Sequence, residues 1–375
     1  MSPAQTGVST VGGLPSKCAA GGRGRLARYK LFVAGVLAAS LASCATVPTV
    51  STELDALELA LGTHVEVLSS DAYGGRKPGT LGGLRTRAYI SEKLAAYGYA
   101  PGATDGSWEQ LVKIASRGGG PARVVLPGTF GTDEEAVESA NVVGVLRGSE
   151  EGSGAVVLMA HWDHLGECAS QVEDRLCNGA VDNASGVAAM LESARLLAAK
   201  GRLQRDVYVV ATTSEEDGLL GANAFADDPP VPLPTIVAAF NFDSSAIAPR
   251  GSPLAVLGWG RTALDRDIAR IASRNGRSVR IRPSQERWLM RQDGWALLQR
   301  DVPSVLVSST FSDEARLQAF EQGTYHKPGD EWGPSVELGG AAQDVLLHVA
   351  LVEHFASTSA YPVGPVAASP DAGEQ

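Results

Sequence analysis

The sequence predicts an α/β fold, a three-layer α/β/α sandwich with a mostly parallel mixed central sheet. Apolar runs of strand length, bounded by Gly and Ser turns, are typical of strands buried on both faces. They occur at 141–146, 155–160, 206–213, 235–242 and 302–309. Helical patterns lie between these runs, and that alternation predicts a sheet covered by helices on both faces.

Helical periodicity marks the segments between the predicted strands. Ile90, Leu94 and Tyr97 recur at i, i+4 and i+7, and Gly98 ends the pattern. A second helix is expected to end at Gly201, and two more are expected at 262–275 and 336–355. The sequence contains no internal repeat, so we predict one folded domain at 53–355.

The N-terminal segment has the pattern of a secretory signal peptide. A basic stretch is followed by the apolar run "LFVAGVLAASLAS", which is too short to span a bilayer. The run ends in "LASC", which resembles the lipobox of bacterial lipoproteins and implies a lipid on Cys44. The alternative is an ordinary signal peptide in which Cys44 is incidental. We therefore expect a signal peptide at 1–43, a lipidated tether at 44–52 and a disordered Ala/Ser/Pro/Gly-rich tail at 356–375.

The signal-peptide pattern predicts an exported protein that is anchored to a membrane through its N-terminal lipid. Ala45 follows Cys44, where an aspartate would mark retention at the inner membrane, so the periplasmic face of the outer membrane is favoured. The whole chain has a net charge of −10, and the segment before Cys44 is basic, so the mature chain is more acidic still. Such a surface argues against a nucleic-acid partner.

Cys168 and Cys177 are the cysteines that remain after Cys18 and Cys44. They stand nine positions apart in a polar loop. In an exported chain this spacing predicts a disulfide, and the alternative is a pair of free thiols. The chain has no C-x-x-C pair of the kind that binds zinc through thiolates.

Metal-binding side chains directly follow three of the predicted strands. Because ligands of open α/β sheets bind at the carboxyl ends of the strands, these side chains are expected to converge. They are His161 and Asp163, Glu215 and Glu216, and Asp243, with Asp182 before a helix and His326 in a loop. Each alone is more often a helix cap or a solvated turn. Together they supply nitrogen and oxygen ligands for more than one zinc ion, as in two-metal hydrolytic sites.

The sequence resembles the clan MH di-zinc exopeptidases, which include bacterial leucyl aminopeptidases, glutamate carboxypeptidase and glutaminyl cyclase. The matching pieces run in the family's order: "GGRKPGT", "SANVVGVLRG", "MAHWDHLG", "NGAVDNASGVA", "TSEEDGLLGANAFA", "NFD" and "YHKPGDEW". The resemblance implies two zinc ions and hydrolysis of a peptide substrate. It implies an aminopeptidase first, with a carboxypeptidase or dipeptidase, a glutaminyl cyclase or an inactive binding relative as alternatives.

The resemblance also implies a role for each site residue. One zinc would bind His161, Asp182 and Asp243, and the other Asp182, Glu216 and His326, with Asp182 bridging. Glu215 would be the general base, Asp163 would hold the ring of His161, and the Asp182–Asn183 peptide would be cis.

The "HWDH" stretch raises the question of which histidine binds metal. Residues two apart share a face of an extended segment, so His161 and Asp163 would face the metal. Trp162 and His164 would then point away, and we expect His164 to be a packed, structural histidine.

Two further stretches bear on function. "GWGRTA" at 258–263 matches a dinucleotide-binding pattern, but it stands late in the chain and lacks the acidic residue about 20 positions further on. In "RQDGW", Arg291 and Gln292 precede Asp293 where relatives often carry Ser-Asp followed by an aromatic residue. Substrate specificity is therefore not carried over from the family.

Overall fold

The computed structural model describes residues 50–116, 122–124, 135–168 and 173–362. The predicted signal peptide, Cys44 and the tether as far as residue 49 lie outside the described residues. The last three residues of the predicted tether, 50–52, belong instead to helix α1 (Val50–Leu68). This amphipathic helix was not predicted, and its buried Leu54, Leu57 and Leu61 explain why it packs onto the domain.

The central sheet is mixed, with a parallel centre and antiparallel flanks, which confirms the predicted fold class. The inner strands β11, β9, β5 and β8 pair in parallel, and β10, β4, β2 and β3 pair antiparallel on either side. Their order is β10 (Ala255–Leu257), β11 (Ser304–Ser308), β9 (Ile236–Asn241), β5 (Ala155–His161), β8 (Asp206–Thr212), β4 (Glu135–Leu146), β2 (Glu109–Ser116) and β3 (Arg123–Val124), and β1 (Ala100–Pro101) joins β4.

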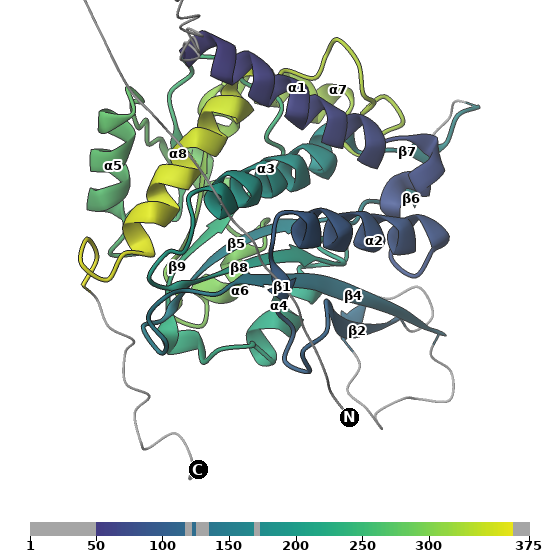
Figure 1. The fold of residues 1–375 in the computed structure, drawn as a ribbon. Coiled ribbons are helices and arrows are strands. Elements are labelled where there is room, and N and C mark those ends of the chain that lie inside the picture. Colours follow the sequence, from purple (N-terminus) through teal and green to yellow (C-terminus); the bar gives the residue numbers. More distant parts are fainter. Residues whose placement is uncertain (1–49, 117–121, 125–134, 169–172, 363–375) are drawn as a thin grey trace, which may run out of the picture. The chain divides into compact units, whose positions relative to one another are not determined.

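Helices cover both faces of the sheet (Figure 1). One layer holds α1, α2 (Leu81–Ala96), α3 (Gly186–Ala199), α5 (Asp265–Arg274) and α8 (Gly339–Phe355). The other holds α4 (Leu220–Asp227) and α6 (Gly294–Leu298). A hydrophobic core lies on each face of the sheet, and alternate residues of β5 belong to each. Val156 and Leu158 pack toward the larger helix layer, whereas Val157 and Met159 pack toward α4 and α6.

Short elements lie around the carboxyl ends of the inner strands. They are η1 (Asp71–Arg76), the hairpin of β6 (Gly166–Glu167) and β7 (Leu176–Cys177), the π-helical turn η2 (Ala180–Ser185), η4 (Pro283–Trp288), η5 (Thr310–Ser312) and α7 (Glu314–Gly323), with η3 (Leu233–Thr235) before β9. Helix α3 begins at Gly186, directly after the η2 turn. Asn183 accepts a hydrogen bond from the Gly186 amide (3.0 Å), which ends the irregular turn and starts the helix.

The C-terminal segment differs from the prediction of a disordered tail from Ala356. Residues 356–362 pack on the domain, because the Arg205 guanidinium donates to the carbonyl oxygens of Phe355 (2.7 Å), Ser357 (3.2 Å) and Tyr361 (2.9 Å). The prediction is therefore wrong for 356–362, and the remaining tail lies outside the described residues. Within the described ranges, no helix is both long and apolar enough to cross a bilayer.

Candidate metal centre

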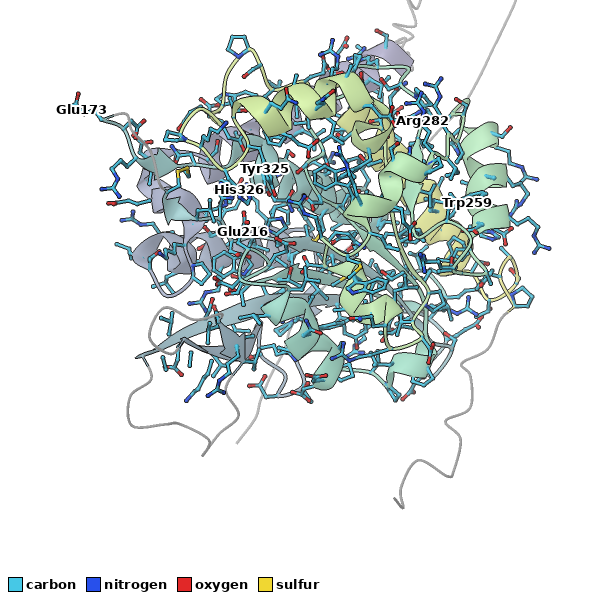
Figure 2. All side chains as sticks on the ribbon, turned by 180° about the vertical axis from the view of Figure 1, so that it is seen from behind. Glu173, Glu216, Trp259, Arg282, Tyr325 and His326 are labelled. Carbon is cyan, nitrogen blue, oxygen red and sulfur yellow. A yellow bond between two sulfur atoms is a disulfide. The ribbon has the colours of Figure 1, made fainter. Side chains whose placement is uncertain are left out.

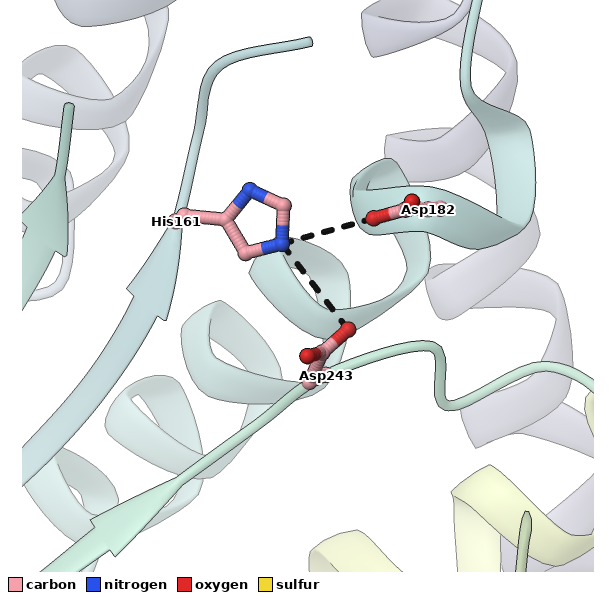
Figure 3. A group of neighbouring side chains, drawn as sticks. All are labelled: His161, Asp182 and Asp243. Carbon is pink, nitrogen blue, oxygen red and sulfur yellow. Dashed lines mark ion pairs between the residues drawn. The ribbon is translucent and has the colours of Figure 1, made fainter. Parts of the chain in front are cut away.

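Three predicted ligands meet at the carboxyl end of the parallel strands (Figure 3). His161 is the last residue of β5, Asp243 follows β9, and Asp182 comes from the η2 turn. His161 Nε2 lies 3.4 Å from Asp182 Oδ1 and 3.8 Å from Asp243 Oδ1. These three side chains form one group with the spacing of a cation site, and His161 and Asp182 are buried.

A second group shares Asp182 with the first. His326 Nε2 lies 3.2 Å from Asp182 Oδ2 and 3.0 Å from Glu216 Oε2. Glu216, Tyr325 and His326 lie close together in Figure 2, which views the molecule from behind Figure 1. Asp182 therefore faces one group with each carboxylate oxygen, which is the arrangement expected of a bridging ligand.

His164 corrects one sequence-based prediction. It does not point away from the site: its Nδ1 lies 2.7 Å from Glu216 Oε1, and it groups with Asp182 and Glu216. The two-residue alternation fails because β5 ends at His161, so the residues that follow are not held in the pleat of the strand. The neighbouring prediction holds, since Trp162 is buried and donates to the Ala140 carbonyl (3.0 Å).

Asn183 connects the segments that carry the first group. Its side-chain amide donates to the carbonyl oxygens of His161 (3.2 Å) and Phe242 (3.1 Å). Its side-chain oxygen accepts from the backbone N–H of Ser244 (3.1 Å). The peptide between Asp182 and Asn183 is cis, as the family resemblance implies.

Arg76 supports the backbone of the same region through hydrogen bonds to four carbonyl oxygens. This fully buried guanidinium donates to the carbonyl oxygens of Trp162 (2.9 Å), Asn178 (2.5 Å), Gly179 (2.8 Å) and Leu68 (3.0 Å). It thereby fastens the loop after His161 to the loop before Asp182. Burial lowers the pKa of Arg76 to about 10, and the nearby carboxylates oppose that shift.

Asp330 holds the η2 turn through two of its backbone N–H groups. It accepts hydrogen bonds from the backbone N–H groups of Val181 (2.9 Å) and Asp182 (3.0 Å). Burial raises the pKa of Asp330 to about 6. Sequence reasoning missed Arg76, Asn183 and Asp330; all three lie in the motifs "GGRKPGT", "NGAVDNASG" and "YHKPGDEW", but residue type alone does not reveal a bracing role.

Asp163 is buried beside His161, as predicted, but its contacts differ in detail. His161 Nδ1 lies 3.2 Å from the Asp163 backbone oxygen and 3.9 Å from its carboxylate. The carboxylate instead accepts from the Glu215 amide (3.1 Å), which fixes the backbone of the predicted general base. Burial raises the pKa of Asp163 to about 8.

Electrostatics at the centre reflect the crowding of carboxylates. Burial disfavours charge on His326, but the adjacent carboxylates of Asp182 and Glu216 outweigh it and raise its pKa to about 9. Burial likewise opposes ionisation of Asp182, but the adjacent imidazoles of His161 and His326 hold its pKa well below its usual range. Burial raises the pKa of Glu215 well above its usual range.

The donor set fits divalent zinc. His161 Nε2 and His326 Nε2 are buried and lack a hydrogen-bond partner among the described residues, although each faces carboxylates within 4 Å. Imidazole nitrogen with carboxylate oxygen is a ligand set that zinc takes in catalytic sites. Backbone angles in the left-handed region recur around the centre, at Arg76 (φ 47°), Ser214 (φ 53°), Ser244 (φ 45°) and His326 (φ 56°). Such strain persists only where the surrounding structure enforces it.

A cavity of about 260 Å³ opens onto the centre. Its floor is formed by the two groups and by Glu215. Its outer wall is largely aromatic and aliphatic and is supplied by η4, η5, α7 and the segments beside them: Trp288, Met290, Phe311, Leu317, Phe320 and Tyr325. Tyr325 stacks on His326, with ring centroids 3.8 Å apart.

A disulfide joins Cys168 to Cys177 across the β6–β7 hairpin. The hairpin packs against η1, and Cys177 directly precedes Asn178, an acceptor of Arg76. The bond therefore limits the movement of the loop that leads to Asp182.

The family model for peptidase family M28 matches residues 141–350 of the 375. The chain belongs to peptidase family M28. The matched part of this M28 chain runs from β4 into α8 and contains every predicted metal ligand.

Two relatives match shorter parts of the M28 chain. A probable zinc metalloprotease of Leptosphaeria maculans is 39% identical over 95 residues, which are 24% of this chain and 20% of that protein. A probable glutamate carboxypeptidase of Arabidopsis thaliana is 30% identical over 145 residues, which are 38% of this chain and 18% of that protein. The matches thus span about a fifth of the length of these relatives.

Among solved structures, BSAP, a zinc aminopeptidase from Bacillus subtilis, superposes with a TM-score of 0.58 at 16% identity. The superposition covers 83% of this chain and 98% of that chain. At this identity the likeness establishes a shared fold.

Proposed function

We propose that this M28 chain is a co-catalytic di-zinc aminopeptidase that removes N-terminal residues from peptides. The observation that carries the proposal is the geometry of Asp182. One oxygen faces His161, which groups with Asp243, and the other faces His326, which also lies 3.0 Å from Glu216. Zinc is the metal that this donor set favours, and it is also named for the Leptosphaeria maculans relative.

The zinc ions, when bound, acidify a water molecule and polarise the scissile carbonyl group. Glu215 accepts a proton from the attacking water as the oxygen–carbon bond forms, and then passes it to the departing amine as the carbon–nitrogen bond breaks. Its raised pKa, caused first by burial, suits a group that must both accept and return a proton. The backbone N–H of Glu215 donates a hydrogen bond to the Asp163 carboxylate, which fixes the backbone of Glu215 beside Glu216.

An aminopeptidase is the first candidate for the direction of cleavage. BSAP, which shares this fold, is a zinc aminopeptidase, and the family resemblance implies the same activity. A carboxypeptidase is the second candidate, because Arg291 also lines the cavity and can pair with a carboxylate.

Both functions are tested with zinc-loaded protein and paired peptides that differ only by N-acetylation. An aminopeptidase is expected to cleave the free peptides and to leave the acetylated ones intact, with two zinc ions per chain by mass spectrometry. Glu215→Gln is expected to keep both metals and to lower turnover by about 10²–10⁴-fold. Cleavage of acetylated peptides from the C-terminus would point to the carboxypeptidase, and near-normal turnover by Glu215→Gln would contradict the base.

We also propose that the mature chain is an exported lipoprotein anchored through Cys44. The support is the basic stretch, the short apolar run and the "LASC" sequence. Two or more acyl chains are needed for stable anchoring, since each buried CH₂ contributes about 0.8 kcal/mol. Fractionation of cells expressing the full chain and Cys44→Ala is the test. A soluble periplasmic full chain without acyl mass on its N-terminal peptide would contradict the proposal.

A further inference from the structure

The cavity has an outer part that the proposed chemistry does not use. Its aromatic wall carries one basic side chain among the described lining residues, Arg291, which stands between η4 and α6. The other charged residue of this outer part, Glu321, is already paired with Arg287 (2.8 Å). The cation of Arg291 therefore dominates the charge at this end of the cavity.

Arg291 is held in a defined place. Its guanidinium lies 4.6 Å from the centroid of the Trp288 ring, and one amino group donates to the Tyr325 hydroxyl (3.1 Å). Tyr325 in turn stacks on His326, so two contacts separate Arg291 from a predicted metal ligand. Stacking on the ring face leaves the in-plane N–H groups directed at other partners.

Arg291 also lacks the partner that its neighbours have. Arg282 pairs with Glu314 (2.7 Å) and Arg287 with Glu321, whereas Arg291 forms no ion pair within the described ranges. Its side chain is exposed, so the remaining N–H groups reach the cavity. A guanidinium that is held in place and forms no ion pair within the described ranges is suited to binding a planar carboxylate by two hydrogen bonds.

We propose that Arg291 forms a subsite for a carboxylate of the peptide substrate. The inference rests on the proposed function, because it assigns the substrate class of the same cavity. In an aminopeptidase the carboxylate is the side chain of an N-terminal Glu or Asp. The other source of the same chemistry is the C-terminal carboxylate of a short peptide.

The test compares kcat/KM for three peptides with zinc-loaded protein. Glu-Ala-NH₂ against Gln-Ala-NH₂ isolates a side-chain carboxylate, and Gln-Ala-OH against Gln-Ala-NH₂ isolates a C-terminal one. We expect the wild type to prefer the carboxylate in one of the two pairs by about ten-fold or more, as charge-assisted hydrogen bonds commonly give. Arg291→Gln is expected to bring that ratio close to one, and Arg291→Lys to retain part of it.

Arg282→Gln is the matched control, because it removes an arginine that lies well away from Tyr325 and His326 (Figure 2). It is expected to leave both ratios unchanged. A purely structural role of Arg291, acting through Tyr325, would lower kcat for all three peptides alike and leave the ratios intact. That result, or a wild-type ratio near one in both pairs, would overturn the proposal.

Binding measurements distinguish failure of the Arg291 subsite from failure of the proposed aminopeptidase function. Calorimetry with zinc-loaded Glu215→Gln, in the Arg291 and Arg291→Gln backgrounds, measures the same ratios as Kd values without turnover. If no peptide is hydrolysed by the wild type but the Arg291-dependent Kd ratio remains, the aminopeptidase proposal fails and the subsite stands. Equal Kd values for all three peptides, or no binding of any of them, would overturn the subsite.

Discussion

The two halves of the metal centre are supported in different ways. The inner half, with His161, lies at the end of a central strand, and its side chain is 1% exposed. The outer half, with His326, comes from a loop, and its side chain is 33% exposed. Arg76 and Asn183 brace the segments that carry His161 and Asp243. Rigid support lowers the cost of assembling a site, so the inner half is expected to hold its zinc more tightly.

Substitution of one histidine at a time tests most directly whether the inner half holds its zinc more tightly than the outer half. We expect His161→Ala and His326→Ala each to lower activity by about 10²-fold or more, because each metal contributes several kcal/mol of charge stabilisation. Dialysis of the wild type against a chelator is expected to release zinc in two phases. His326→Ala should keep the slow phase and His161→Ala only the fast one. The reverse assignment would show that the outer half holds the tighter zinc.

Arg76 tests whether bracing explains the difference. Arg76→Met leaves buried carbonyl oxygens without a donor, so we expect the free energy of unfolding to fall by about 3 kcal/mol or more. Arg76→Lys keeps the charge but loses the fork that joins Trp162 to Gly179. In the folded Lys variant we expect zinc affinity to fall about 10–100-fold, with the slow phase of zinc release accelerated. An unchanged slow phase would mean that Arg76 supports the fold but not the metal.

Protonation provides a milder perturbation of the metal-free protein. The folded pKa values of His326, about 9, and Asp163, about 8, lie above the unfolded values of about 6.5 and 3.8. Groups whose pKa is raised on folding lose their stabilising contribution as pH rises through the folded value. The metal-free protein should therefore lose stability between pH 7 and pH 9, on the order of 1 kcal/mol per pH unit. Thermal melts with and without zinc check this: zinc should flatten or reverse the trend, and a rise in metal-free stability would contradict it.

The disulfide is expected to have the smallest effect. Closing a loop of nine residues stabilises by about 3 kcal/mol or less. We expect Cys168→Ser with Cys177→Ser to lower the melting temperature modestly and to lower activity less than Arg76→Lys does. Comparison of zinc release with the wild type decides whether the hairpin matters to the inner half. A fold that fails to form without the bond would show that the hairpin does more than steady a loop.

The sequence predicts the fold and the residues of the site for a common reason. Strands buried on both faces are apolar throughout, as in β5, and the side chains that follow them share one edge of a parallel sheet. The antiparallel strand β2 was missed because its apolar residues, Leu111, Val112, Ile114 and Ala115, form neither a strict alternation nor a continuous apolar run. Helix α1 was missed because it begins within the segment taken for a tether.

The details that sequence did not predict depend on loops. His164 turned toward Glu216 because the chain leaves the strand at His161, and no pattern in "HWDH" marks that point. Arg76 meets its acceptors across long separations in the chain, so its partners are visible only once the fold is known. The role of Arg291 is of the same kind, since it depends on the stacking of Trp288 and Tyr325.

The hydrogen bonds of Arg205 to the last residues that the structure describes have a practical consequence. Arg205 directly precedes β8, so it fastens Tyr361 at the amino end of that strand, whereas the proposed catalytic side chains gather at the carboxyl ends. A purification tag, a fluorescent reporter or a solid support joined after Tyr361 would therefore leave the cavity mouth open to peptides. Chains that end before Ala356 would lose the Ser357 and Tyr361 carbonyl oxygens that accept from the buried Arg205 guanidinium, and should express poorly.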